Sequence, residues 1–162
     1  MTPADKSYEE KVLTLEVATA LRSRARTNSN RIVFTNGCFD LLHRGHVTFL
    51  QRARALGDVL ILGLNSDHSV RRLKGPGRPI LLMEDRVALL AGLESVDHIC
   101  VFEEDTPEKL LHLLLPDILV REVTTRTTRS SVEILWNLVG AKLLSSPTQR
   151  VVQPQRLSLE YS

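Results

Sequence analysis

The sequence predicts an α/β fold in which helices cover both faces of a parallel sheet. Two observations predict it: short runs of Val, Ile and Leu end in polar or turn-forming residues, and segments with helical periodicity separate these runs. Strands that alternate with helices in this way form parallel sheets with right-handed crossovers. A chain of 162 residues is long enough for one such core and too short for two ordinary domains.

Residues 1–30 are expected to form a helical segment ahead of this core. From Glu9 to about Arg26, apolar side chains recur at helical spacing, namely Val12, Leu15, Val17, Ala18 and Leu21. The polar run at residues 28–30 then breaks the pattern.

The core is predicted to span residues 31–120. Its first strand covers residues 32–34 and ends at the turn-forming pair Asn36 and Gly37. Later strands are expected at residues 59–64, 99–102 and 118–120. Helical periodicity predicts helices at residues 47–56, 68–73, 83–93 and 107–115, the last with Pro107 in its first turn. In such sheets the ligand crevice lies at the carboxyl ends of the strands.

The composition excludes several classes of protein. No apolar run approaches the roughly 18 uncharged residues of a membrane span, and the start MTPADKSYEEK lacks the apolar core of a secretory signal. We therefore expect a cytoplasmic protein without a membrane partner. Cys38 and Cys100 match no paired metal-ligand spacing, so reduced thiols are expected. The net charge of +2 arises in residues 121–162 and does not predict binding to nucleic acid.

The connection after the first strand carries the clearest chemical signal. It contains Thr35, Asn36, Gly37, Cys38, Phe39 and Asp40, followed by His43, Gly45 and His46 at the start of the next helix. Small residues let the backbone approach a phosphate, and a helix N-terminus offers free amides and the positive end of its dipole. A single histidine here would most simply cap the helix, but two histidines around a glycine favour a shared anionic ligand.

These residues resemble a known superfamily, the cytidylyltransferase-like nucleotidyltransferases. HRGH fits their His-x-Gly-His signature, which glycerol-3-phosphate cytidylyltransferases and pantetheine-phosphate adenylyltransferases share. The strings FTNGCFDLLHRGHVTFLQRARALGD, LNSDHSVRRLKGPGRPI and DRVALLAGLESVDHICVFEEDTPEKLL are similar to the heptose-1-phosphate adenylyltransferases of lipopolysaccharide-core synthesis. The resemblance covers about Leu13 to Val120 and implies a Rossmann-like fold.

The resemblance also implies site residues beyond the first connection. Asn65 and Asp67 follow the second strand, where they can line the crevice, although Asp67 could equally cap the next helix. Lys74 and Arg78 lie in a glycine-flanked loop, and a cation there supplies positive charge to a phosphate. An exposed loop cation without a ligand is the alternative interpretation.

The implied reaction is attack of a sugar 1-phosphate on the α-phosphorus of ATP, which releases pyrophosphate and leaves an ADP-sugar. A phosphate monoester has a second pKa of about 6, so the nucleophile needs no general base near neutral pH. His43, His46 and Lys74 are the expected catalytic residues, stabilising charge together with Mg²⁺. A separate sugar kinase would supply the 1-phosphate, and no metal ligands on the protein are predicted.

The sequence changes character at Arg121. The segment REVTTRTTRSS replaces the alternation of strands and helices, and after it only residues 132–144 show helical periodicity. The family's Gly-Gly-Asp-Tyr turn and Ser-Thr-Thr segment are missing. We expect an atypical, disordered tail at residues 121–162 and a core without its regular C-terminal strand and helix. The resulting unpaired sheet edge would favour homo-oligomers.

A frameshift is one hypothesis for this tail. If codons are regrouped as the third base of one residue and the first two of the next, the stretch from Arg121 permits Gly-Gly-Asp-Tyr. In the same frame, SPTQRVVQPQ permits a run that ends in Ser-Thr-Thr. A divergent tail is the alternative. For the function, the alternatives are a cytidylyltransferase acting on another small phosphate and an inactive family member.

Overall fold

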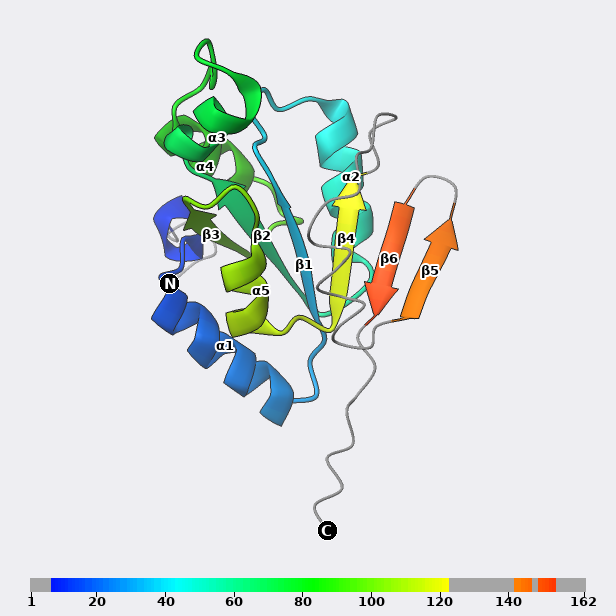
Figure 1. Ribbon diagram of the computed structural model, residues 1–162. Helices are drawn as coiled ribbons and strands as arrows, with labels where there is room; N and C mark the ends of the chain where they lie inside the picture. The colour runs from blue at the N-terminus through cyan, green and yellow to red at the C-terminus, as the bar shows by residue number, and fades with distance from the viewer. Residues whose placement is uncertain (1–6, 123–141, 147–148, 154–162) are drawn as a thin grey trace.

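The computed structural model describes residues 7–122, 142–146 and 149–153, which form one sheet with helices on both faces (Figure 1). The strand order is β3-β2-β1-β4-β6-β5. Four strands are parallel to one another, β1 (Ile32–Gly37), β2 (Val59–Asn65), β3 (His98–Phe102) and β4 (Ile118–Glu122). The predicted α/β class with a parallel sheet and helices on both faces is therefore confirmed.

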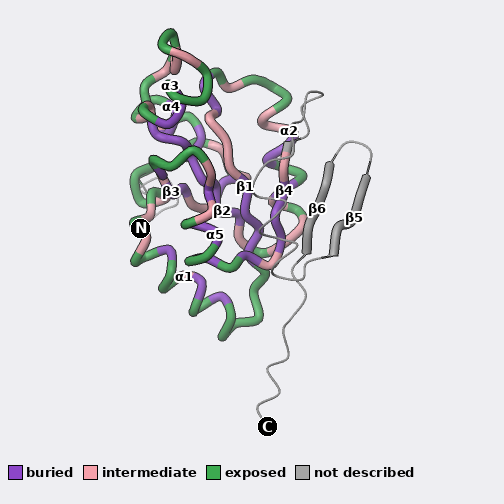
Figure 2. Tube along the Cα trace, in the orientation of Figure 1, coloured by how far each residue is buried: buried purple, intermediate pink, exposed green. Residues whose placement is uncertain are grey.

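Two helices pack on each face of the sheet. Helices α2 (Arg44–Arg54) and α4 (Met83–Ala91) contribute to one apolar cluster, and α1 (Leu15–Thr27) and α5 (Glu108–Leu114) to the other. Side chains alternate along β1, so Val33 belongs to the first cluster while Ile32 and Phe34 belong to the second. The central strands are buried on both faces (Figure 2), as parallel strands between helical layers must be.

The predicted continuous helix from Glu9 to Arg26 is wrong. A short 3-10 helix, η2 (Tyr8–Lys11), precedes α1, and the chain between them is extended. There the Leu13 amide donates to the Ile99 carbonyl at 2.8 Å, which forms a bridge to the edge of β3. The Thr14 hydroxyl then caps α1 by accepting from the Val17 amide at 3.4 Å. Edge pairing and a polar cap outweigh helical periodicity at this point.

Two helix starts differ from prediction in ways that affect the crevice. Helix α2 begins at Arg44, not Val47, so His46 lies in its first turn. Pro107 is the residue before α5, whose first helical residue is Glu108. Helix α3 (Asp67–Lys74) begins directly after β2, and its cap is Ser66, whose hydroxyl accepts from the Ser69 amide at 3.2 Å. Asp67 is therefore not the N-cap.

The predicted open edge beside the fourth strand is also wrong. Strand β6 (Gln149–Gln153) pairs antiparallel with β4, with Val152 opposite Leu119, and β5 (Lys142–Ser146) pairs with β6. Consecutive β-branched residues in β6 favour a strand, and pairing satisfies the backbone groups of β4. Residues 142–144 thus lie in a strand and not in the predicted helix.

The rest of the predicted tail lies outside the described residues. The residues concerned are 123–141, 147–148 and 154–162. They include most of the helix expected at 132–144, and the predicted disorder of these residues is therefore not tested. The division of the chain into residues 1–30, 31–120 and 121–162 stays a prediction. Within the described ranges, no helix has the length and apolar character needed to cross a membrane.

Candidate active site

The ligand crevice predicted at the carboxyl ends of the strands falls where β1 ends and α2 begins. His43 is the N-cap of α2, and its Nδ1 accepts a hydrogen bond from the Gly45 amide at 3.1 Å. Because Nδ1 is an acceptor, the neutral ring carries its proton on Nε2 and can donate it to an anion. His43 therefore caps the helix, as the simpler interpretation held, and still keeps a donor for a ligand.

The two histidine rings lie against each other. The imidazoles of His43 and His46 are stacked with centroids 3.8 Å apart and an interplanar angle of 24°. Phe39 contacts His46 edge-on, with centroids 5.1 Å apart. Phe39 is buried while His43 is exposed, so the pair extends from the apolar core to the surface. The structure thus brings the two predicted histidines together, and their shared anionic ligand stays a prediction.

Replacing Gly45 with alanine is expected to disturb the pair. A Cβ at Gly45 would lie 2.9 Å from the Cε1 and Nδ1 atoms of His43, so the ring would have to move. Misplacement of a catalytic group by about 1 Å can cost on the order of 10²-fold in rate. We expect a loss of that order in turnover with little change in melting temperature, because His43 is exposed. An unchanged turnover would show that the ring position is unimportant.

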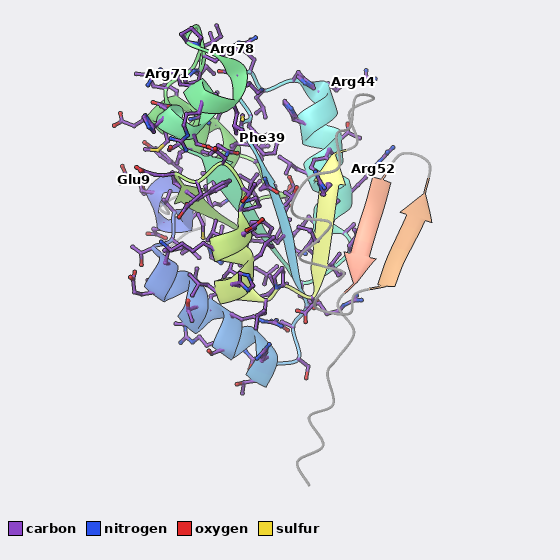
Figure 3. The ribbon with its side chains drawn as sticks, viewed as in Figure 1. Glu9, Phe39, Arg44, Arg52, Arg71 and Arg78 are labelled. Atoms are coloured by element: carbon purple, nitrogen blue, oxygen red, sulfur yellow. The ribbon has the colours of Figure 1, made fainter. Side chains whose placement is uncertain are left out.

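Asp40 fixes the loop between α3 and α4. Its carboxylate accepts from Arg78 and from the Ile80 amide, both at 2.6 Å, and from the Leu81 amide at 3.2 Å. Figure 3 shows Arg44 at the start of α2 and Arg78 in this loop, both at the end of the molecule where the parallel strands finish. The structure thus pairs Asp40 and Arg78, which were both predicted to bind phosphate, with each other. Asp40 acts by holding the loop, while the Arg78 side chain stays 41% exposed.

The carboxylate of Asp40 should make the free energy of unfolding depend on pH. Burial alone would raise its pKa, but the hydrogen bonds from Arg78, Ile80 and Leu81 outweigh burial and hold the pKa below the ordinary value of 3.8. A lowered pKa stabilises the fold above the unfolded-state value, and this contribution is lost as pH falls through the folded-state value.

Asp40→Asn should therefore lower the free energy of unfolding at pH 7 by about 1–3 kcal/mol. Urea denaturation at pH 7 and at about pH 3 measures the difference between the two proteins. The difference should shrink at the acidic pH, because that pH lies below the ordinary value of 3.8, where the stabilising contribution of the lowered pKa diminishes. A difference that is the same at both pH values would contradict the assignment.

Lys74 lies near the first connection. It is the last residue of α3, and Gly75 follows with φ of 102°, a backbone conformation that favours glycine. Burial raises the pKa of the Cys38 thiol, and the positive charges of Lys74 and Arg86 partly oppose this increase. Lys74 is exposed, and its positive charge acts on Cys38 in the connection after β1.

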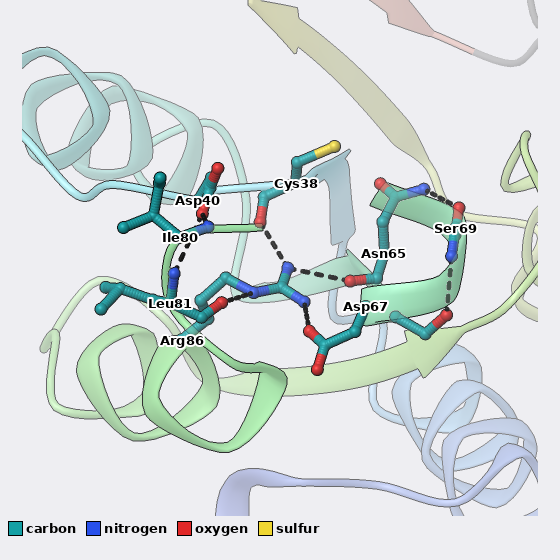
Figure 4. Close-up of polar contacts among 9 residues, drawn as sticks. Cys38, Asp40, Asn65, Asp67, Ser69, Ile80, Leu81 and Arg86 are labelled. Carbon is teal, nitrogen blue, oxygen red and sulfur yellow. Dashed lines mark hydrogen bonds and ion pairs between the residues drawn. The ribbon is translucent and has the colours of Figure 1, made fainter. Parts of the chain in front are cut away.

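Asn65 and Asp67 serve the framework of the crevice. The Asn65 amide donates to the Ser69 hydroxyl at 2.9 Å, and that hydroxyl donates to the Glu104 carbonyl at 2.9 Å. The Asp67 carboxylate accepts from Arg86 at 2.7 Å. Figure 4 shows that these groups connect the ends of β1 and β2 with the start of α4. Both predicted ligands are thus close to the crevice and occupied by protein partners.

Arg86 organises this network, although it was not among the site residues predicted from the sequence. Its side chain is 0% exposed, and it donates to the carbonyls of Cys38 at 2.6 Å, Asn65 at 2.9 Å and Leu81 at 3.1 Å, besides Asp67. One guanidinium therefore ties both strand ends to the loop before α4. The available signal was a charged residue on the same helical stripe as Val87 and Leu90.

A separate surface groove of about 550 Å³ lies along α5 and is lined by Glu104, Thr106, Glu108, Lys109, His112 and Leu113. None of the predicted site residues contributes to it. The predicted catalytic histidines lie elsewhere, at the connection after β1, where their stacked rings meet the N-terminus of α2.

A parallel α/β sheet with this histidine pair at the start of α2 fits the class that the sequence resemblance implied, the nucleotidyltransferases. The chain belongs to the cytidylyltransferase-like family, whose model matches residues 34–154. The match extends past Val120, where the sequence resemblance was expected to end, and includes β5 and β6. Membership of a nucleotidyltransferase family, the predicted enzyme class, is confirmed.

The chain is similar to several proteins called bifunctional protein HldE. It is 64% identical over 94 residues to that of Helicobacter pylori strain P12, which covers 58% of this chain and 20% of the relative. For the protein of Trichlorobacter lovleyi the identity is 54% over 116 residues, which cover 72% of this chain and 24% of the relative. For the protein of Wolinella succinogenes the identity is 52% over 113 residues, which cover 70% of this chain and 24% of the relative. The chain thus spans about a quarter or less of these relatives.

Among solved structures, the chain is similar to a lipopolysaccharide core biosynthesis protein from Thermoplasma volcanium. The TM-score is 0.55 and the sequence identity is 28%, with 65% of this chain and 83% of that chain covered. The similarity supports the Rossmann-like arrangement of sheet and helices.

Proposed function

We propose that the chain transfers AMP from ATP to a heptose 1-phosphate, giving ADP-heptose and pyrophosphate for lipopolysaccharide-core synthesis. The observation that carries the proposal is the stacked pair His43 and His46 at the N-terminus of α2, with Lys74 nearby. The similarity to HldE proteins, at 64% identity for one of them, supports the choice of substrate.

In the proposed reaction, an oxygen of the sugar 1-phosphate forms a bond to the α-phosphorus of ATP. The bond from that phosphorus to the bridging oxygen breaks, and pyrophosphate leaves with the electron pair. The Nε2–H of His43 and the ring of His46 stabilise the charge on the transferred phosphoryl group, and Lys74 stabilises the leaving pyrophosphate. The free amides at the start of α2 add positive potential at the same point.

Mg²⁺ is proposed to enter with ATP, bound to its phosphates. The described residues hold no group of three or more His, Cys, Asp or Glu side chains suited to a metal ion. Asp40 and Asp67, whose carboxylates lie at the crevice, bind arginines instead. Mg²⁺ commonly keeps several waters and binds through substrate phosphates, so this donor set fits a nucleotide-borne ion. A sugar kinase activity is proposed to supply the acceptor.

The proposal is tested by incubating the purified chain and Mg²⁺ with ATP or CTP, and with heptose 1-phosphate or glycerol 3-phosphate. Mass spectrometry identifies the products. ADP-heptose from ATP alone is the expected result. A CDP product would instead support the cytidylyltransferase alternative, and no product from any pair would support an inactive family member.

The origin of the tail needs a test at the level of the gene. Resequencing across the codons for residues 119–125 would show whether a base is missing or extra. If the frame is as given, the family match through residue 154 describes the protein that the cell makes. If resequencing reveals a missing or extra base, we expect the corrected reading frame to encode the Gly-Gly-Asp-Tyr turn. The protein made from that corrected frame should bind ATP more tightly.

A further inference from the structure

A chain of hydrogen bonds fixes the orientation of the Asn65 side-chain amide. Its Nδ2 donates to the Ser69 hydroxyl at 2.9 Å, and that hydroxyl donates to the Glu104 carbonyl at 2.9 Å. A backbone carbonyl only accepts, so the single proton of the Ser69 hydroxyl is committed to Glu104. The Ser69 oxygen can therefore only accept from Asn65, and the atom that faces it must be the amide nitrogen.

The same chain leaves the side-chain carbonyl of Asn65 as an acceptor. Figure 4 shows its Oδ1 atom on the side of the amide that faces away from Ser69. No donor among the residues that the structure describes reaches this oxygen. The residue is only 3% exposed, so the amide is held in place. Because a buried carbonyl without a donor is unfavourable, the position favours a ligand that brings one.

The place of Asn65 in the sheet indicates which substrate it meets. It is the last residue of β2, and Nη1 of Arg86 donates both to its carbonyl at 2.9 Å and to that of Cys38 at 2.6 Å. The end of β2 therefore lies beside the connection after β1. The parallel strands run β3-β2-β1-β4, so their order reverses between β1 and β4, and nucleotides bind at such a switch point. Asn65 lies on the other side of β1, which favours the acceptor substrate over the nucleotide.

We propose that Asn65 is a specificity-determining residue whose Oδ1 accepts a hydrogen bond from a hydroxyl group of the acceptor sugar. A carbonyl oxygen attracts a hydroxyl donor and repels the oxygens of a phosphate. This role therefore differs from the phosphate-binding role predicted from the sequence. Ser69 is the positioning residue, because its hydroxyl keeps the amide from turning over. The inference rests on the proposed function, since it concerns the second substrate of the same site.

Calorimetry with heptose 1-phosphate and its monodeoxy analogues tests this role, because each analogue lacks one hydroxyl. The wild type should bind one analogue about tenfold more weakly than heptose 1-phosphate, the effect of one hydrogen bond. Asn65→Ala should bind that analogue and heptose 1-phosphate equally well. Ser69→Ala, which lets the amide turn, should also discriminate less, and it serves as the test if Asn65→Ala fails to fold. Wild-type discrimination in the variants, or none in the wild type, would overturn the proposal.

Nucleotide analogues separate the acceptor sugar from the ribose of ATP as the source of the hydroxyl. Deoxy-ATP that lacks either the 2′- or the 3′-hydroxyl binds without reacting when no acceptor is present. Asn65→Ala should leave the affinity of each analogue relative to ATP as it is in the wild type. A relative affinity that changes in Asn65→Ala would assign the hydroxyl to the ribose and overturn the acceptor assignment. Discrimination at a sugar hydroxyl in a protein without adenylyltransferase activity would refute only the proposed function.

Discussion

His46→Ala is expected to lower the turnover of adenylyl transfer by about 10²- to 10³-fold, the range seen when a donor to a developing anion is removed. His46 lies in the first turn of α2, stacked on His43, and the N-cap of that helix is His43. The substitution should therefore reduce catalysis far more than stability. Pyrophosphate release and thermal unfolding, measured on the same preparation, check both parts of this expectation.

His43→Ala is a poorer test of the same idea. It would remove the cap of α2 as well as a donor, and loss of a cap costs about 1 kcal/mol. His68→Ala serves as the control for His46→Ala. His68 is exposed on α3, so its replacement should change neither turnover nor stability. If His46→Ala retained wild-type turnover, the histidine pair could not be the phosphate site.

Arg86→Met is expected to cost about 3–5 kcal/mol of unfolding free energy, the range for breaking a buried ion pair by removing one partner. The change would leave three backbone carbonyls and the Asp67 carboxylate, whose side chain is 28% exposed, without the buried Arg86 donor. Since domains are stable by only about 5–15 kcal/mol, the variant should be close to unfolding. Urea denaturation of the purified protein measures the loss.

Arg72→Met is the matched control for Arg86. Arg72 also pairs with a carboxylate, Asp105 at 2.8 Å, but its side chain is 39% exposed. An exposed ion pair contributes about 0–1 kcal/mol, so this change should be small. Equal losses for the two variants would contradict the assignment of Arg86 as the organising residue of the crevice.

The sequence predicted the parallel core because each buried strand is a compact run of apolar residues. Strands β1 to β4 were all located, with ends that differ by a few residues. The N-terminal segment was harder, since Val12 fits a helical pattern while its bridge to β3 decides its conformation. Periodicity reports local preference only and carries no information on which distant edge a segment will meet.

The sequence predicted the location of the candidate site better than it predicted which side chains contact one another there. His43, Gly45 and His46 were found from their spacing, because a helix N-terminus constrains where adjacent side chains lie. Asp40 and Arg78 were expected to contact a ligand and instead contact each other. Arg86 was missed because its four acceptors come from segments that are far apart in sequence, which only the fold brings together.

The C-terminal strands were missed for a different reason. Strands β5 and β6 are only five residues each, and their sequences KLLSS and QRVVQ carry no clear alternation. Their pairing depends on the edge that β4 offers. The frameshift hypothesis was drawn from the missing Gly-Gly-Asp-Tyr turn and remains a prediction, because residues 123–141 lie outside the described part of the chain.

The most direct test of the central claim is an NMR titration of the histidine rings with MgATP. The signals of His43 and His46 should shift together and saturate at one dissociation constant. Those of His68 and His112, which are exposed on α3 and α5, should stay in place. If calorimetry showed ATP binding while His43 and His46 did not respond, the N-terminus of α2 would not be the phosphate site.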